Sequence, residues 1–160
     1  MNDFDALLRA VLAQARSLGI PVSSAIAPHV VVNTRALTRF GCCVRRGGSF
    51  QIQLTHRLLD APEQSCRETL AHEVLHTCPG CQDHGQRWRA YAARMNAAFG
   101  YHISRTSRPE DLGVADLRPV RHLVVCQKCG REFPRTKASN LTLHPERYRC
   151  KCGGTLVLKY

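Results

Sequence analysis

The stretch His72-Glu73-Val74-Leu75-His76 decides how this chain of 160 residues is interpreted. Positions four residues apart lie on one face of an α-helix, so His72 and His76 can present both imidazoles to one metal ion. Glu73 follows the first histidine and can reach a water molecule held at an open coordination position. Two nitrogen ligands with an adjacent carboxylate base form the HExxH arrangement of zinc hydrolases. The alternative is a helix that contains two histidines by chance, because so short a motif also arises without function.

A catalytic zinc ion normally has three protein ligands, so this motif needs a third. Pro79 and Gln82 stand where the metzincin pattern requires glycine and histidine, which excludes that class. No acidic residue lies between Asp83 and Glu110, which disfavours a glutamate ligand from a later helix. His84 is the strongest candidate, because a Pro-Gly break after the motif allows the next helix to point it back at the first pair. The alternative for His84 is a solvent-facing residue at the start of that helix.

The first hundred residues show the periodicities of a small α+β domain. Apolar residues at helical spacing predict an N-terminal helix from about residue 3 to residue 18. A β-branched run at 30–32 and a hairpin with arms at 40–44 and 50–54 predict a small antiparallel sheet. The edge of that hairpin is the candidate to hold an extended substrate by backbone hydrogen bonds, and a purely structural hairpin is the alternative.

The motif helix and the helix after it have recognisable start and stop signals. The first is expected to begin within residues 62–65, where Ser65 and Glu68 fit a capping box, and to break at the Pro-Gly pair after the motif. The second is expected to begin with Asp83 as its N-cap and to stop at Gly100.

The chain contains nine cysteines and eight histidines, and several cysteines have the C-x-x-C or C-x-C spacing that indicates metal binding more than disulfides. Near the C-terminus, Cys126, Cys129, Cys150 and Cys152 adjoin glycine turns and short strands, which predicts a zinc ribbon. So short a segment builds little apolar core, and a bound metal supplies the missing stability. The short C-x-C spacing leaves His144 open as a substitute ligand.

Another C-x-x-C, Cys78 and Cys81, lies between the second and third proposed ligands of the first site. These thiols could bind metal, form a redox-sensitive pair or shape the loop. We favour the loop-shaping role.

The chain has a formal net charge of +11, and the excess is concentrated near its C-terminus. Residues 121–160 contain nine Lys or Arg and two acidic residues, a net charge of +7, whereas residues 1–120 have a net charge of +4. Such an excess favours DNA or RNA as a partner, and a basic surface without a partner is the alternative. The candidate nucleic-acid contacts are Arg131, Arg135, Lys137, Arg147, Arg149 and Lys151.

The length suits one compact domain, residues 1–120, followed by a small module, residues 121–160. No apolar run approaches the length of a membrane span, and the start of the chain is acidic where a signal peptide would be basic. We therefore expect a cytoplasmic monomer with no membrane partner.

The run from His72 to His76, followed by Asp83-His84-Gly85 and Trp88, resembles the SprT-like metallopeptidases, the family that includes Spartan. The hairpin segment at 46–52 and the C-terminal ribbon also resemble that family. The similarity therefore extends over most of the chain, from about residue 30 to its end.

The resemblance implies a zincin-like protease domain in which His72, His76 and His84 bind the catalytic zinc ion and Glu73 is the base. With the ribbon, two zinc ions are expected, one catalytic and one structural. Spartan-type enzymes cleave proteins that are bound or crosslinked to DNA, which accords with the basic charge. The predicted function is a zinc-dependent endopeptidase that acts on such proteins. The alternative is a non-catalytic adaptor whose ribbon binds nucleic acid, but a purely structural zinc site has no need of Glu73.

Overall fold

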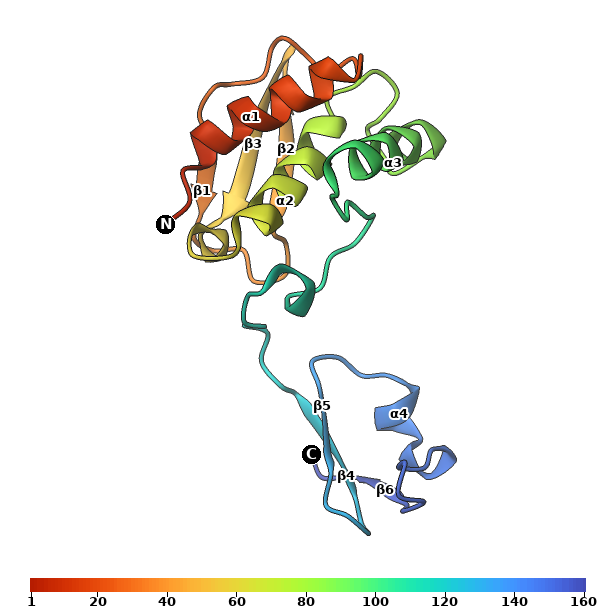
Figure 1. Ribbon diagram of the computed structural model, residues 1–160. Helices are drawn as coiled ribbons and strands as arrows, with labels where there is room; N and C mark the ends of the chain where they lie inside the picture. Colours follow the sequence, from red (N-terminus) through yellow and green to blue (C-terminus); the bar gives the residue numbers. More distant parts are fainter. The chain divides into compact units, whose positions relative to one another are not determined.

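A computed structural model describes all 160 residues. The chain forms two compact units, residues 1–116 and 117–160, each with a hydrophobic core of its own (Figure 1). The boundary expected from the sequence lay after residue 120. Both units combine helices with small sheets, so the expected α+β class is confirmed. None of the helices has the length and the apolarity that crossing a membrane requires.

The first unit contains a three-stranded sheet in the order β1-β3-β2. Strand β2 (Gly41–Arg46) pairs antiparallel with β3 (Ser49–Thr55) around a turn at Gly47, whose φ of 61° favours glycine. Strand β1 (Val31–Asn33) pairs with β3 in parallel, so the expectation of an antiparallel sheet is wrong for this strand. Strand β3 therefore lies between β1 and β2, which run in opposite directions. The apolar run at 30–32 identifies a strand but carries no information on its direction.

Helices α1 (Phe4–Ser17) and α2 (Glu63–Leu75) cover one face of this sheet (Figure 1). Helix α1 begins at Asp3, whose side chain accepts a hydrogen bond from the Ala6 backbone N–H. Two short 3-10 helices, η1 (His56–Leu59) and η2 (Glu110–Leu112), lie in the connecting segments.

Helix α2 begins with Pro62 in the N-cap position, and the capping box expected from Ser65 and Glu68 does not form. Ser65 already lies inside the helix, where it is buried and its carbonyl accepts the Thr69 hydroxyl. The helix ends at Leu75, a few residues before the Pro-Gly pair at which the sequence predicted the break.

Helix α3 (Gln86–Phe99) packs against α2 and ends at Gly100, which adopts a φ of 67° as a helix-terminating glycine does. Gly85 occupies its N-cap position, so the N-cap predicted at Asp83 is wrong. Asp83 instead accepts a hydrogen bond from the Gly85 backbone N–H at 3.0 Å and shapes the turn before the helix.

The core of the first unit holds α2 firmly against the sheet. Several apolar side chains of α2, the sheet and the other two helices have no exposure or almost none. Packing of this density fixes the position of the helix backbone and of the side chains that point away from the core. The largest of these side chains are Leu8, Val11, Ile52, Leu54, Leu70, Val74, Leu75, Trp88 and Met95.

The second unit is built on an antiparallel sheet of order β5-β4-β6. Its strands are β4 (His122–Cys126), β5 (Glu132–Arg135) and β6 (Leu156–Leu158), with a short helix α4 (Asn140–Leu143) and a 3-10 turn η3 (Pro145–Arg147) between the last two. Strand β5 was not expected, because its charged residues and a central proline give no strand pattern. The buried core contains only Val124, Cys126, Cys150 and Leu156, two of which are cysteines.

Candidate metal centre

Helix α2 and the segment after it bring three histidines together. His72 lies on α2 and His76 at its C-cap, and their ring centroids are 5.2 Å apart. The chain then turns and returns His84, whose ring centroid lies 4.8 Å from each of the other two. One ring nitrogen from each histidine lies within 4.8 Å of the others. The three side chains that were proposed as ligands therefore converge on one point.

Backbone carbonyl groups determine which nitrogen of two of these rings faces the centre. His72 Nδ1 lies 2.9 Å from the carbonyl oxygen of Ser104, and His76 Nδ1 lies 2.8 Å from that of Cys81. Each Nδ1 donates its proton to a carbonyl, so each Nε2 keeps a lone pair. A carbonyl on the outer nitrogen is the usual support of a metal-binding histidine. The sequence analysis missed Ser104 and Cys81 in this role, because a backbone oxygen leaves no signal in the residue type.

The inner nitrogens fit a cation. His84 Nε2 lies 2.9 Å from His72 Nε2, and two lone pairs at this distance repel each other unless a proton or a metal ion lies between them. Burial, and then the neighbouring His76 and His84, lower the pKa of His72 to about 4, and burial also lowers the pKa of His84. Neutral imidazoles are favoured at pH 7, so a metal ion suits this site better than a proton does. Three imidazoles that converge in this way are a ligand set that zinc prefers.

Trp88 of α3 packs against the rings of all three histidines. Its ring centroid lies 4.8, 5.7 and 4.7 Å from those of His72, His76 and His84. Its indole N–H points to the carbonyl oxygen of His72 at 3.4 Å, and the side chain is almost fully buried. Trp88 thus restricts the orientation of the three rings.

Glu73 lies beside the three histidines, one position after His72, and is 8% exposed. The Cys43 backbone hydrogen-bonds its carboxyl group, and the charge of Arg39 also favours the carboxylate. Burial outweighs both effects and raises the pKa of Glu73 to about 7. A carboxyl group with such a pKa gains and loses a proton readily near neutral pH.

Strand β2 passes so close to Glu73 that only glycine fits at position 41. A Cβ atom at Gly41 would lie 2.7 Å from Oε1 and 2.8 Å from Cγ of Glu73, and 3.0 Å from Cγ2 of Thr69. The sequence analysis did not single out Gly41, because a glycine at the start of a strand has many explanations. The structure gives it one, the close approach of the strand to a carboxyl group.

Two cavities open at this site and share part of their lining. One of about 500 Å³ is lined by β2 residues and by all three histidines. The other, of about 230 Å³, is lined by residues 38–41, by residues 102–107 and by Glu68, Thr69, His72 and Glu73 of α2. Arg39, Gly41, His72 and Glu73 line both. The two cavities therefore adjoin at His72 and Glu73, and the larger one, which all three histidines line, is called the groove below.

Cys78 and Cys81 lie in the turn between His76 and His84, and both are buried in the core. Burial raises the pKa of both thiols, in the case of Cys78 to about 12, so they remain protonated. The Cys81 backbone N–H donates to the Cys78 carbonyl, and the Cys81 carbonyl accepts from His76. These contacts agree with the loop-shaping role favoured from the sequence.

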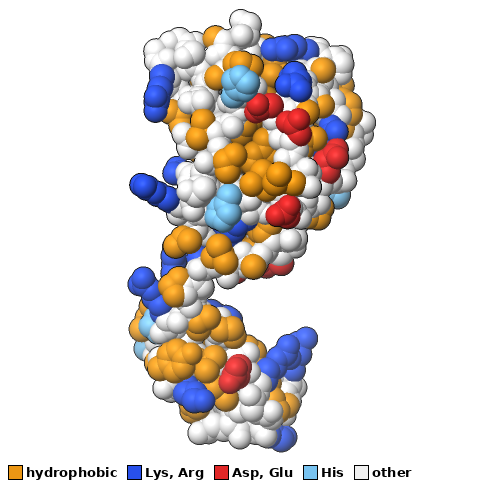
Figure 2. All heavy atoms as spheres, turned by 90° about the vertical axis from the view of Figure 1, so that its left-hand side faces the viewer, with side chains coloured by type: hydrophobic (Ala, Val, Ile, Leu, Met, Phe, Trp, Pro, Cys, Tyr) orange, Lys and Arg blue, Asp and Glu red, His pale blue; other side chains and the backbone are white.

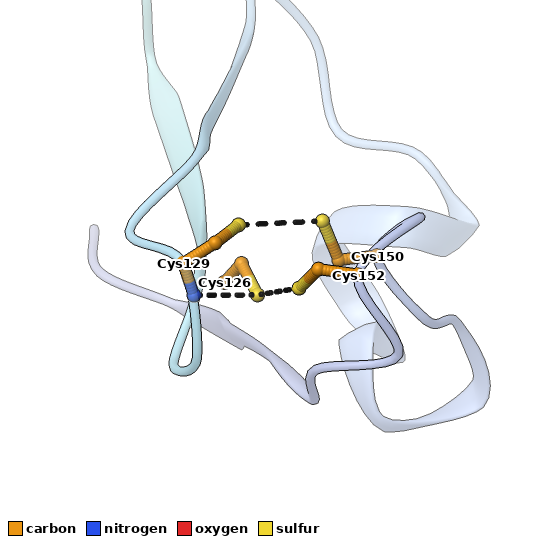
Figure 3. Close-up of side chains that lie close together, drawn as sticks. All are labelled: Cys126, Cys129, Cys150 and Cys152. Atoms are coloured by element: carbon orange, nitrogen blue, oxygen red, sulfur yellow. Dashed lines mark hydrogen bonds between the residues drawn. The ribbon is translucent and has the colours of Figure 1, made fainter.

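In the second unit, four cysteine sulfurs face one another (Figure 3). Cys126 Sγ lies 3.5 Å from Cys152 Sγ, and Cys129 Sγ lies 3.6 Å from Cys150 Sγ. These distances are far too long for disulfides, and they approach the separation of about 3.8 Å that tetrahedral zinc–thiolate bonds of about 2.3 Å impose. His144 is not part of this group and lies near Glu146 instead, so the alternative ligand that the sequence left open is not brought to the site.

Backbone groups prepare the four-cysteine group for a metal ion. The Cys129 backbone N–H donates to Cys126 Sγ at 3.5 Å, and this bond is the main reason why the pKa of Cys126 falls to about 6. A side chain at Gly154 would collide with Cys126 Sγ, so the chain reaches the sulfurs only because this residue is a glycine. The four thiols fit a zinc ion, which binds the thiolate form.

A cavity of about 270 Å³ in the second unit combines basic and aromatic side chains. Phe133, Leu141 and Tyr148 form its apolar part, and the Arg131 guanidinium lies 5.8 Å from the Phe133 ring centroid. Figure 2 shows basic side chains around apolar ones on the surface of this unit. Of the six cations proposed as nucleic-acid contacts, Arg131, Arg135, Arg149 and Lys151 line the cavity, and Lys137 and Arg147 do not.

Comparison with known families identifies the first unit. The model of the SprT-like family matches residues 11–107, which include the three histidines, Glu73 and the carbonyl-bearing Ser104. The chain belongs to the SprT-like family. This confirms the family resemblance seen in the sequence, and membership points to a protease that depends on a metal ion. The SprT-like match stops before the four-cysteine unit, and comparison with curated proteins gave no match.

Proposed function

We propose that this SprT-like protein is a zinc-dependent endopeptidase of the zincin type that acts on proteins bound or crosslinked to DNA. One observation carries the proposal: the lone pairs of His72 and His76 converge with His84 beside a buried carboxyl group, Glu73, inside a groove. A structural metal site has no use for a nearby base or an open groove. The first site is therefore proposed as the catalytic zinc site and the four-cysteine group as the structural one.

His72, His76 and His84 would hold the zinc ion, which would supply an activated water molecule and polarise the carbonyl group of the scissile peptide. Glu73 accepts the proton of the attacking water through its carboxylate and returns it to the leaving amine. Its burial supports both steps, because a pKa of about 7 makes the two protonation states of the carboxyl group similar in free energy at neutral pH. Gly41 and the Cys43 backbone amide hold the carboxyl group in place.

The free edge of β2 is proposed to bind the substrate. Strand β2 is an edge strand, and Phe40 and Thr55 form a hydrogen-bonded pair across the hairpin. By the alternation of an antiparallel ladder, Gly41, Cys43 and Arg45 then direct their backbone groups away from β3. The Cys43 amide already binds Glu73, so the other outward backbone groups are the ones open to a substrate. An extended peptide can add to this edge as a further strand, which places one of its peptide bonds beside Glu73.

The second unit is proposed to bind DNA with an unpaired base in its basic and aromatic cavity. Phe133 and Tyr148 offer surfaces on which a base can stack, and the surrounding arginine and lysine side chains suit the phosphates. Such a unit would keep the protease close to proteins attached to DNA.

The proposal is tested with purified protein and an unstructured substrate such as casein. Bound zinc is measured by elemental analysis, and cleavage is followed with and without single-stranded DNA. We expect about two zinc ions per chain and cleavage that a chelator abolishes and DNA stimulates. A protein that binds two zinc ions and DNA but cleaves no substrate would instead be the non-catalytic adaptor.

His84→Ala should weaken zinc binding at the first site, because it removes one of three ligands and leaves the other two in place. We expect the affinity for that ion to fall by at least about 10²-fold, the loss that even a supporting partner of a ligand can cause. The measurement is a competition titration with a chromogenic chelator. His29→Ala is the matched control, since this side chain is 82% exposed and belongs to neither metal group. Equal zinc affinity of the two variants would remove His84 from the ligand set.

Gly41→Ala should displace the Glu73 carboxyl group and leave the three histidines in place. We expect kcat to fall by about 10- to 100-fold, because a shift of about 1 Å in a reacting group costs up to about 10²-fold. Zinc content should not change. Gly48→Ala on the same hairpin is the control, since nothing lies within 4 Å of a Cβ atom there. A positioning role for Gly41 is wrong if both variants turn over substrate at the same rate.

A further inference from the structure

Two arginines face the 230 Å³ cavity beside Glu73 without an acidic partner. Arg39 comes from the segment before β2, and Arg105 comes from the segment whose Ser104 carbonyl supports His72. Both are exposed, and neither forms an ion pair. The Arg39 guanidinium makes only a weak contact of 3.7 Å with Cys42 Sγ. Two positive charges from separate parts of the chain are therefore available to a ligand in one cavity.

The other charged groups of this cavity are already engaged. Glu68 Oε1 accepts hydrogen bonds from the Gln64 amide at 3.0 Å and from the His102 backbone N–H at 2.9 Å, and the His102 ring lies 3.3 Å away. Glu73 belongs to the proposed catalytic machinery. The hydroxyl groups of Thr38, Thr106 and Ser107 also line the cavity and can donate to an anion. The hydroxyls of Thr69 and Ser104 already donate to the backbone carbonyl groups of Ser65 and Thr106.

The cavity adjoins the place where the chemistry is proposed to occur. His72 and Glu73 line it together with Arg39 and Arg105. A residue adjacent to the scissile bond would therefore place its side chain within the reach of both.

We infer that this cavity is a specificity subsite that binds an acidic side chain, Asp or Glu, next to the peptide bond that is cut. The inference rests on the proposed endopeptidase function and names its substrate preference. A carboxylate fits the chemistry because arginine forms paired hydrogen bonds with it, and because the walls formed by α2 and by residues 102–107 reduce the screening by water. A lysine or arginine at that substrate position would meet two like charges, and a large apolar side chain would cover both charges without pairing them.

A phosphate group of DNA has the same charge but is the poorer occupant. The cavity shares Arg39, Gly41, His72 and Glu73 with the groove, so a nucleic-acid strand that filled it would block the reacting groups. The occupant that the proposed reaction requires at this place is the polypeptide itself.

The test uses the full chain and three fluorescent peptides that differ only in one residue beside the bond that is cut, which is first located by mass spectrometry on casein fragments. That residue is Glu, Gln or Lys. Binding to the Glu73→Gln variant is measured by fluorescence anisotropy, and cleavage by the unmodified protein is measured as kcat/KM. We expect the affinity and the kcat/KM of the Glu peptide to exceed those of the Gln peptide by about 10- to 100-fold, the effect of a charged hydrogen bond of about 1.5–3 kcal/mol. The Lys peptide should have the lowest values of both.

Two double variants then link the preference to these arginines. In the variant Arg39→Gln with Arg105→Gln, the kcat/KM for the Glu peptide divided by that for the Gln peptide should fall toward one. In the variant Arg39→Glu with Arg105→Glu, the Lys peptide should have the highest kcat/KM of the three. The ratio is informative even where the absolute rate falls. Arg35→Gln is the matched control, because Arg35 lies on the same segment as Arg39 and lines neither cavity, so it should change neither the ratio nor the rate.

Several results would overturn the inference and leave the proposed function intact. These are equal binding and cleavage of the three peptides, an unchanged ratio in the double variants, and an equal loss for all three peptides, which would assign the arginines to the reaction itself. Weaker DNA binding by the double variants with an unchanged peptide ratio would assign the cavity to phosphate. Failure of the proposed function is distinguishable, since casein would then yield no fragments at the first step, before any peptide is compared.

Discussion

Glu73→Gln should lower kcat by about 10²- to 10⁴-fold, the contribution that a positioned general base makes to proton transfer. The reason is that a glutamine amide cannot accept the proton of the attacking water, although it has the shape of the carboxyl group. The variant should still bind zinc through the three histidines, because the ring nitrogens and their carbonyl supports do not involve Glu73. Turnover is measured on a fluorogenic peptide, and zinc content by elemental analysis.

Glu63→Gln is the matched control on the same helix. The Glu63 side chain is 58% exposed and forms an ion pair with Arg67 one turn away. Glu63 is the first residue of α2, whereas the histidines lie at the end of that helix and after it. Such surface pairs contribute little to stability, so we expect folding, zinc content and turnover close to those of the unmodified protein. Near-normal turnover of Glu73→Gln would show that another group takes the proton and that the proposed mechanism is wrong.

Some contacts of the site join residues that are close in the sequence, and others join residues that are distant in it. Mainly the former can be predicted from the sequence. The i, i+4 spacing of His72 and His76 follows from helix geometry, which is why the motif could be recognised without a structure. The return of His84 was inferred from the Pro-Gly break, and the structure places that ring beside the pair. The connecting segment is longer than expected, because α2 ends at Leu75 and α3 begins only after Gly85.

The long-range parts depend on which segments meet after folding. Ser104 supports His72 across 32 positions of the chain, and Gly41 adjoins Glu73 across a similar separation. Neither contact leaves a periodic pattern, because one uses a backbone oxygen and the other the absence of a side chain. The parallel pairing of β1 was missed for a related reason, since three apolar residues predict a strand but not its neighbour. The unpaired Arg39 and Arg105 likewise became notable only when they were found to line one cavity.

Removal of the second unit, leaving residues 1–120, should reduce the affinity for single-stranded DNA by about 100-fold or more at moderate salt. The removed part carries +7 of the formal charge of +11, and a four-cysteine zinc site would offset two units of it. Loss of about four phosphate contacts should also lower the slope of log K against log salt by about 3, since each contact on a single strand contributes about 0.7. The shortened chain should remain folded and bind one zinc ion, because its core and its three histidines all precede residue 120. The measurement is a salt titration of DNA affinity for both proteins.

Two double variants of the full chain distinguish the contribution of the proposed cavity to DNA affinity from the contribution of net charge. Arg149→Gln with Lys151→Gln removes two charges that line the cavity, whereas Lys137→Gln with Arg147→Gln removes two that do not. Net charge alone predicts equal losses of affinity for the two variants, because counterion release counts phosphates and not their surroundings. The cavity predicts a larger loss for the first variant, since a base stacked on Phe133 or Tyr148 also loses the cations that hold its phosphates. Equal losses would show that the second unit attracts DNA by its overall charge, and an unchanged affinity after removal of the whole unit would place the DNA contact on the arginines of the first.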